Sequence, residues 1–282
     1  MTKPAGKGTL YALAAIALWS TLAWLSLKLA HVPPFLLVGS ALAIGSLASI
    51  GQLRAWRASP RLLALGVYGL FGFHFLLFLA LRHAPPVEAN LVNYLWPLLI
   101  VVLAPLVLRG YRLTVRHVAA ALMGLTGAAL LVTGGGRVEF NASHALGYAL
   151  ALGSAFIWAT YSLATKRAGA FPTATVGLFA AASALLALAL HAWLEPAYAF
   201  TASDLPWLAL IGAGPMGAAF FLWDAALKRG DPRRIGTLAY LTPMLSTLVL
   251  AGSGEGRLSI TAIAAMALIV GGAALAARAG SD

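Results

Sequence analysis

The sequence contains ten apolar runs, each long enough to cross a lipid bilayer as a helix. A hydrocarbon core about 30 Å thick requires roughly 20 helical residues at about 1.5 Å per residue. Short connections between the runs hold most of the charged residues and the Pro-Pro, Gly-Gly-Gly and Gly-Asp-Pro breakers. The sequence therefore predicts an all-α polytopic membrane protein with ten transmembrane helices. Their approximate limits are 8–28, 33–53, 62–82, 89–108, 114–133, 146–165, 173–193, 206–227, 234–251 and 259–277.

Composition points to the same class. The chain is 61% hydrophobic and 10% charged, whereas a soluble domain carries about 25% charged residues. Ten spans in 282 residues leave no room for a soluble catalytic domain, and the lack of cysteine excludes disulfides, thiolate metal sites and Cys nucleophiles. The start of the chain is similar to a signal peptide, but its apolar stretch is too long and Ala12-Leu13-Ala14 comes too early for cleavage. We therefore predict a retained first span.

The net charge of +11 would suggest a nucleic-acid partner in a soluble protein. Here, however, 15 of the 19 Lys and Arg residues fall in connections on the same side as the N-terminus, while five of the eight acidic residues fall on the other side. Basic connections remain cytoplasmic in polytopic membrane proteins. The charge therefore indicates a topology with both termini in the cytoplasm and argues against nucleic acid as a partner.

The second half of the chain repeats motifs of the first half in the same order. The matched positions are Gly8 and Trp19 with Gly147 and Trp158, and Tyr94-Leu95-x-Pro97 with Tyr240-Leu241-x-Pro243. Two five-helix repeats are therefore predicted, at 1–137 and 138–282. Because five is odd, the second repeat must start on the opposite side of the membrane and is inverted. Inverted repeats are typical of secondary transporters, whose site lies near the bilayer midplane between the halves; a duplication kept only for packing is the alternative.

These duplicated motifs resemble the drug/metabolite transporter superfamily, in its EamA-type branch of ten-span exporters. The positions that carry the resemblance are Trp19 and Lys28 with Trp158 and Lys166, Pro97 with Pro243, and Glu255-Gly256-Arg257-Leu258-Ser259. The first repeat lacks that Glu and reads Arg109-Gly110-Tyr111-Arg112-Leu113-Thr114. The resemblance implies a bacterial inner-membrane exporter, and within the branch the sequence is most similar to exporters of aromatic amino acids. The direction of transport rests on this resemblance.

One ionisable side chain other than tyrosine lies deep in a predicted span. His74 is near the middle of the third span, with Phe71 and Phe78 on the same helical face. Polar side chains at this depth are costly and often functional, so His74 is either a packed histidine bonded to a carbonyl or part of a cavity wall, where it would be the candidate proton carrier. Asp224 precedes Lys228 by four residues, which predicts an interfacial salt bridge on one helix face.

Polar and aromatic residues cluster before a proline in the fourth span. Pro97 has no backbone N–H and frees the carbonyl of Asn93, which must find a partner or line a wet cavity. Trp19 and Trp158 are equivalent deep residues and are expected to flank a central cavity, with a lipid-facing position as the alternative. The predicted substrate-binding residues are Trp19, His74, Phe78, Asn90, Asn93, Tyr94, Trp96, Trp158 and Tyr240, with helix breaks at Pro97 and Pro243. Trp24, Trp56, Trp193 and Trp207 are interpreted as interfacial anchors.

The residue census narrows the substrate. No Lys or Arg lies at the predicted midplane to neutralise a phosphate, so an aromatic or zwitterionic small molecule, such as an aromatic or neutral amino acid, fits better. We predict a transporter that works by alternating access and needs no cofactor or metal. The alternatives are a broad drug or metabolite exporter, a passive channel and an intramembrane enzyme. The sequence has no His-Glu-x-x-His motif, clustered carboxylates or Ser/His/Asp set to support an enzyme.

Overall fold

The computed structural model describes residues 6–169 and 171–279, and within these ranges the chain is helical without any strand. Ten helical stretches in this part of the chain are long and apolar enough to cross a membrane. Their limits differ from the predicted ones by no more than four residues, so the predicted fold class is confirmed. The ten spans are Lys7–Lys28, Pro34–Trp56, Pro60–His83, Pro86–Val107, Val115–Thr133, Ala142–Ala168, Thr173–Leu194, Leu205–Arg229, Pro232–Gly252 and Ile260–Arg278.

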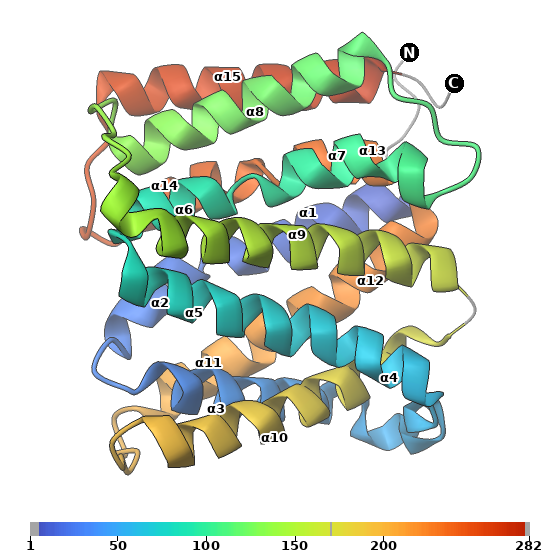
Figure 1. The fold of residues 1–282 in the computed structure, drawn as a ribbon, viewed down its shortest axis with the longest axis vertical. Helices are drawn as coiled ribbons and strands as arrows, with labels where there is room; N and C mark the ends of the chain where they lie inside the picture. Colours follow the sequence, from blue (N-terminus) through green and yellow to red (C-terminus); the bar gives the residue numbers. More distant parts are fainter. Residues whose placement is uncertain (1–5, 170, 280–282) are drawn as a thin grey trace.

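Most spans are built from two or three helical segments (Figure 1). In the first five spans the segments are α1 (Lys7–Ser20), α2 (Leu22–Lys28), α3 (Pro34–Ser46), η1 (Leu47–Trp56), α4 (Pro60–Val67), η2 (Tyr68–Gly72), α5 (Phe73–His83), α6 (Pro86–Asn93), α7 (Trp96–Val107) and α8 (Val115–Thr133). In the last five they are η3 (Ala142–His144), α9 (Ala145–Ala168), η4 (Thr173–Thr175), α10 (Val176–Leu194), α11 (Leu205–Ala213), η5 (Gly214–Ala218), α12 (Ala219–Arg229), α13 (Pro232–Leu238), α14 (Leu241–Gly252) and α15 (Ile260–Arg278).

The irregular segments occur at corresponding positions in the two halves. The third and eighth spans each contain one π-helical turn, η2 and η5. The fourth and ninth spans each break for two residues, at 94–95 and 239–240, just before Pro97 and Pro243. Both prolines lie in the first turn of the helix that follows, where a missing N–H is tolerated. Paired discontinuous helices mark the substrate site in many transporters.

The two halves pack against each other (Figure 1). Helix α8 lies beside α15, and α3 lies beside α10 at the other edge of the molecule. Between these edges, α9 packs on α5 and α7, while α1 packs on α12 and α14. Exchanging the halves converts the contacts of α9 with α5 and α7 into those of α1 with α12 and α14, and leaves the α8–α15 and α3–α10 pairs unchanged. In Figure 1 the first span begins at the end that carries both termini, and α9 begins at the opposite end.

Glycines allow the closest helix crossings, as is usual where membrane helices pack together. A Cβ atom placed on Gly45 of α3 would lie 2.7 Å from Cα of Gly217 in η5, and one on Gly124 would lie 2.3 Å from the Tyr240 ring. Four further glycines make similarly close contacts: Gly66, Gly69, Gly127 and Gly272. Gly72 is different, because its nearest neighbour is at an ordinary distance of 3.4 Å.

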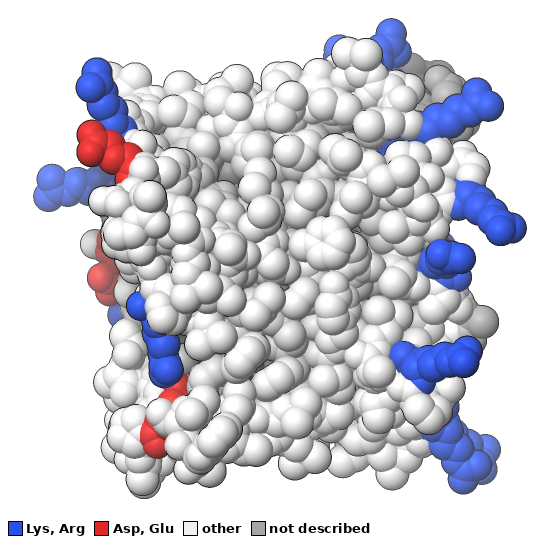
Figure 2. Space-filling view, viewed as in Figure 1, with Lys and Arg blue, Asp and Glu red and all other residues white. Residues whose placement is uncertain are grey.

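Charged side chains gather at the two ends of the molecule (Figure 2). On the face shown, basic side chains line the end where the termini lie, whereas the other end carries acidic and basic side chains together. We call the first the terminal end and the second the far end. The wide surface between them is uncharged, as expected for a surface that contacts lipid.

Two carboxylates fasten the hairpin between α2 and α3 to the connection between α10 and α11 at the far end. Glu195 accepts hydrogen bonds from the backbone N–H groups of Phe35 (3.0 and 3.1 Å) and Leu36 (3.2 Å), at the start of α3. Asp204 is bonded to Nε2 of His31 at 3.0 Å and also accepts from Tyr198 and Thr201. The hydrogen bonds from Thr201 are the main reason that the pKa of Asp204 falls to about 2.

Candidate substrate site

Five aromatic rings from four spans meet between the two halves. They come from α1, α7, α9 and α12, and we call them the aromatic cluster: Trp19, Trp96, Trp158, Phe220 and Trp223. The Trp19 ring is in contact with the other four, with centroid separations of 5.1 to 6.4 Å. The equivalent residues Trp19 and Trp158 are 5.9 Å apart. These separations and tilted or edge-on arrangements are those of favourable aromatic pairs.

Hydrogen bonds fix the orientation of two indoles in the cluster. Trp19 Nε1 donates to the carbonyl of Pro215 at 3.1 Å, and this carbonyl lies in the π-helical turn η5. Trp223 Nε1 donates to Oγ of Ser162 at 3.0 Å. Each bond joins two spans that are distant in sequence. These bonds hold the indoles in fixed orientations. The cluster could therefore recognise a solute that contains an aromatic ring.

His74 lies at the edge of the aromatic cluster. Its ring is 6.4 Å from Phe220 and 5.1 Å from Phe73, measured between centroids. Nδ1 lies 2.6 Å from the carbonyl oxygen of Leu70, and because a carbonyl only accepts, Nδ1 is assigned the proton. In neutral imidazole the other nitrogen, Nε2, is then an acceptor. It makes no hydrogen bond to the part of the chain that the structure describes.

The aromatic rings around His74 differ in part from those that the sequence predicts. Phe78 lies 6.3 Å from the His74 ring, as expected, but Phe71 stacks on Phe75 at 5.6 Å instead. Phe73 takes the expected place of Phe71. The cause is η2, because a π-helical turn holds more residues than an α-helical one and rotates the side chains before it away from the face that His74 occupies.

The broken fourth span brings unbonded polar groups to the same region. Asn93 is buried and its Oδ1 has no hydrogen-bond partner, and the Tyr94 hydroxyl makes no hydrogen bond to the described residues. Trp96 follows directly and belongs to the aromatic cluster. Asn90 is directed elsewhere, because its Nδ2 donates to the carbonyl of Pro86 on its own helix at 2.9 Å. Three of these four residues therefore remain available to a ligand through ring or polar atoms.

Tyr240 lies outside the aromatic cluster. Its ring is fully buried against Gly124 and it packs with Ala128 and Ile269 between α8 and α15. Its hydroxyl donates to the carbonyl of Tyr94 at 3.2 Å, in the break of the fourth span. Tyr240 therefore satisfies a carbonyl that the break exposes and connects the two broken spans. The sequence predicts a freed carbonyl at Asn93. The carbonyl that Tyr240 bonds is that of the next residue, Tyr94.

Sequence reasoning missed Phe220 and Trp223. One signal could have found Phe220, because it follows His74 by 146 positions, the offset that relates Tyr94 to Tyr240. Trp223 is one helical turn further along α12 and is 1% exposed, so it belongs with the deep tryptophans. The predicted ion pair at the end of the same helix is confirmed: Lys228 Nζ lies 2.7 Å from Oδ2 of Asp224.

Comparison with known proteins agrees with this architecture. The model of the EamA-like transporter family matches residues 6–133 and again 145–278. A curated relative from Ancylobacter novellus, named aromatic amino acid exporter YddG, is 43% identical and the match covers 95% of this chain and 96% of the relative. A relative of the same name from Salmonella typhimurium is 32% identical, with 87% and 88% covered.

A solved crystal structure has the same fold, with a TM-score of 0.91 at 42% identity over 95% of this chain and 96% of the other. The ten apolar helices make the protein a multi-pass membrane protein. With one family model covering nearly all of both halves and a relative 43% identical, the chain belongs to the EamA-like transporter family.

Proposed function

We propose that this protein is a secondary transporter that exports aromatic and other neutral amino acids by alternating access, with the aromatic cluster as its substrate site. The observation that carries the proposal is the meeting of five aromatic rings between the halves, next to His74 and the broken fourth span. Two relatives covering most of the chain are named aromatic amino acid exporters, which supports the same substrate class.

The chemistry of the cluster suits an aromatic zwitterion. In this conformation the rings contact one another, and a substrate ring would replace some of these contacts when the halves move apart. Nε2 of His74 and Oδ1 of Asn93 are acceptors without partners. They would accept from the ammonium or indole N–H of the substrate, and an ammonium would also be attracted to the indole faces.

Alternating access is supported by the arrangement of the halves. We propose inverted repeats at 1–137 and 138–282, because the first and sixth spans begin at opposite ends and the contacts between halves exchange in pairs. We place the basic terminal end in the cytoplasm, following the charge distribution (Figure 2). The membrane is the bacterial inner membrane, as the exporter relatives suggest.

The test is counterflow in proteoliposomes that contain the purified protein. Vesicles loaded with unlabelled tryptophan are given labelled Trp, Phe, Thr or a neutral drug outside. We expect labelled Trp and Phe to accumulate transiently and Thr to accumulate more slowly. Exchange of the drug at the same rate would favour a broad exporter, and uptake without counterflow would favour a channel. Failure of both aromatic amino acids to exchange would overturn the substrate assignment.

A further inference from the structure

A basic cavity opens between the halves at the terminal end. It has a volume of about 550 Å³ and is formed by the α7–α8 connection, the end of α9 and the end of α12. A second cavity of about 420 Å³ adjoins it and shares Tyr111, Lys166 and Lys228. The larger volume lies in the range of about 300 to 1,000 Å³ that is usual for small-molecule sites.

The cations around the two cavities outnumber their carboxylate partners. Six basic residues line the cavities, and the only acidic one among the lining residues, Asp231, is bonded to Arg233 at 2.6 Å. Lys228 is neutralised by Asp224. Lys166, Arg109 and Arg167 have no carboxylate partner in the described part of the chain. The larger cavity therefore has an excess of positive charge.

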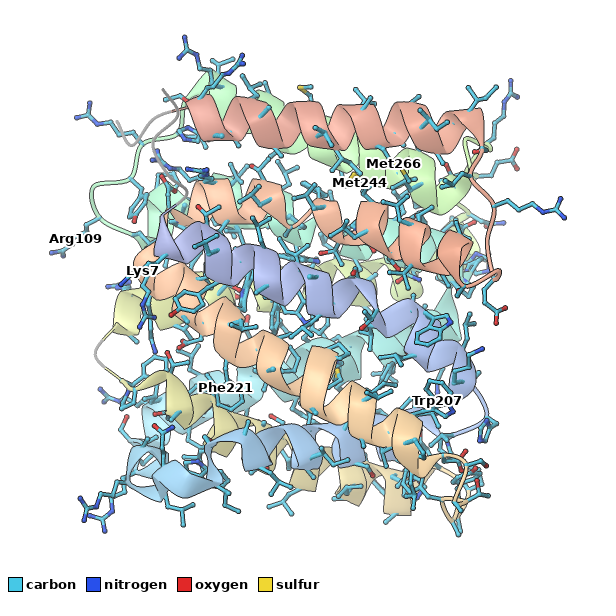
Figure 3. All side chains as sticks on the ribbon, turned by 180° about the vertical axis from the view of Figure 1, so that it is seen from behind. Lys7, Arg109, Trp207, Phe221, Met244 and Met266 are labelled. Atoms are coloured by element: carbon cyan, nitrogen blue, oxygen red, sulfur yellow. The ribbon has the colours of Figure 1, made fainter. Side chains whose placement is uncertain are left out.

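Of these cations, Lys166 is the best placed to bind an anion in the cavity. Its Nζ donates to the carbonyls of Leu227 (2.7 Å) and Gly230 (2.9 Å), so its ammonium group is fixed at the cavity wall with one N–H left over. The Tyr111 ring lies 5.9 Å from Nζ. Arg109 makes no hydrogen bond to the described residues, and Figure 3 shows it extending outward from the α7–α8 connection.

The cavity lies on the same two helices as the aromatic cluster. Trp158 precedes Lys166 by eight residues on α9, and Trp223 precedes Lys228 by five on α12. At about 1.5 Å per residue, the cavity is about 8 to 12 Å from the cluster along these helices. The spacing is short enough for one route to connect them. The aromatic cluster itself includes no cation that could receive a carboxylate.

We propose that this cavity is an anion site in which Lys166 binds the carboxylate of the substrate, with the positive charge of Arg109 at the cavity mouth attracting it, before the aromatic ring of the substrate reaches the aromatic cluster. The inference rests on the proposed function for the identity of the substrate, and on the cavity and its unpaired cations for the site. A charge-assisted hydrogen bond from an ammonium or guanidinium group is the interaction that a carboxylate requires. The cavity thus selects amino acids over amines of the same shape.

Binding to purified protein in phosphatidylcholine nanodiscs tests the site. The probes are indole-3-propionate, which has the carboxylate but no ammonium, and tryptamine, which has the ammonium but no carboxylate. We expect Lys166→Gln to weaken indole-3-propionate binding by about tenfold, equivalent to about 1.4 kcal/mol. Arg109→Gln should weaken it less, by about threefold, because Arg109 extends outward (Figure 3) and acts through its charge. Tryptamine affinity should change by less than about twofold, since tryptamine lacks the group that these cations bind.

Three comparisons keep the test decisive. Arg116→Gln removes an exposed cation of α8 outside the lining and should bind both probes like the parent. Lys166→Arg retains the charge and should restore affinity, which separates binding from the structural bonds to Leu227 and Gly230. Arg109→Gln keeps the test valid if Lys166→Gln fails to fold, because Arg109 makes no hydrogen bond that the structure shows.

Two results would overturn the inference. One is equal affinity of the parent, Lys166→Gln and Arg109→Gln for indole-3-propionate. The other is evidence that the cavity binds an anionic lipid instead. In that case phosphatidylglycerol nanodiscs would abolish indole-3-propionate binding and would raise the Tm of the parent but not that of Lys166→Gln. Counterflow of tryptophan by the parent is measured on the same preparation. Failure of tryptophan counterflow would reject the proposed function. Binding of indole-3-propionate tests the cavity alone.

Discussion

At the scale of single residues, chemically unlike groups occupy equivalent positions around the aromatic cluster. Trp19 and Trp158 are equivalent and in contact, and His74 faces its equivalent Phe220 at 6.4 Å. With the halves arranged as the proposed inverted repeats, contact between equivalent residues places the axis relating them in the cluster. The polar group therefore lies on one side of the axis only. A substrate in the cluster would have one preferred orientation, with its N–H groups toward His74.

Trp158 is the ring for which we expect the largest effect of removal on transport. It contacts Trp19, Phe73, Trp96, Tyr161 and Phe220. Trp158→Ala should raise the KM for tryptophan by about thirtyfold, the factor expected for a buried aromatic hot spot worth about 2 kcal/mol. Counterflow at a series of tryptophan concentrations measures this. Trp193→Ala is the control, since Trp193 is 81% exposed near the far end of α10; an unchanged KM in Trp158→Ala would remove Trp158 from the site.

His74 can be tested by removing or retaining its acceptor. His74→Phe places the residue of the other half at this position and should fold, but it loses Nε2 as an acceptor. We expect the KM for tryptophan to rise by about tenfold, because hydrogen bonds to charged groups are worth about 1.5 to 3 kcal/mol. His74→Gln keeps an acceptor oxygen and should have a smaller effect. Equal KM values for the parent and both variants would show that the substrate does not bond to His74.

Some residue positions could be predicted from the sequence and others could not. Trp19, Trp96 and Trp158 lie in the aromatic cluster because depth in a span is a property of sequence position alone. The error at Phe71 comes from the π-helical turn η2, whose hydrogen-bond shift depends on packing against other spans. The repeated motif predicts Tyr240 at the site. Its side chain instead packs against Gly124, where the missing Cβ leaves room for the ring.

At the scale of the elements, the paired irregularities explain where the cluster forms. The turn η5 presents the carbonyl of Pro215 to Trp19, and η2 presents that of Leu70 to His74. The positions of Pro97 and Pro243 predict the breaks in spans four and nine, because proline removes a helical hydrogen bond. No comparable residue marks both π-helical turns. The sequence therefore indicated two of the four irregularities.

The crossing of α3 and η5 joins the halves through backbone contact and should not tolerate a larger residue. A Cβ on Gly45 would lie 2.7 Å from both Cα of Gly217 and the carbonyl oxygen of Met216, so the backbones must separate. Gly45→Val should lower stability by about 1 to 3 kcal/mol through overpacking. Thermal unfolding in detergent measures this against Gly51→Val, where nothing lies within 4 Å of the added atom. Similar Tm losses in both variants would contradict the proposed crossing constraint.

At the scale of the whole molecule, the two ends differ in how their charged side chains are paired. Carboxylates at the far end are bound by groups of the opposite half: Glu195 by the start of α3, Asp204 by His31, and Glu255 by Lys28 at 3.0 Å. The terminal end instead holds cations around an open cavity. An exporter requires substrate to approach from the cytoplasm, so the proposed topology places the cavity on the side where substrate is collected.

The far-end contact of Asp204 gives a specific dependence of stability on pH. Hydrogen bonds from Thr201 lower the pKa of Asp204 from its ordinary value of 3.8 to about 2. A carboxylate with a depressed pKa stabilises the fold fully above its unfolded pKa, and this contribution is lost as the pH falls through the folded value. Stability from Asp204 is therefore expected at about pH 4 and above and should disappear between about pH 4 and pH 2.

Comparing the parent with Asp204→Asn isolates this contribution from other titrating carboxylates. At neutral pH the variant should have the lower Tm, because the neutral amide is a weaker acceptor for Thr201, Tyr198 and His31. The Tm difference should shrink toward zero between about pH 4 and pH 2. Glu139→Gln removes an exposed acid and should match the parent throughout. A constant difference between the parent and Asp204→Asn at all pH values would show that the charge of Asp204 does not hold the hairpin to the opposite half.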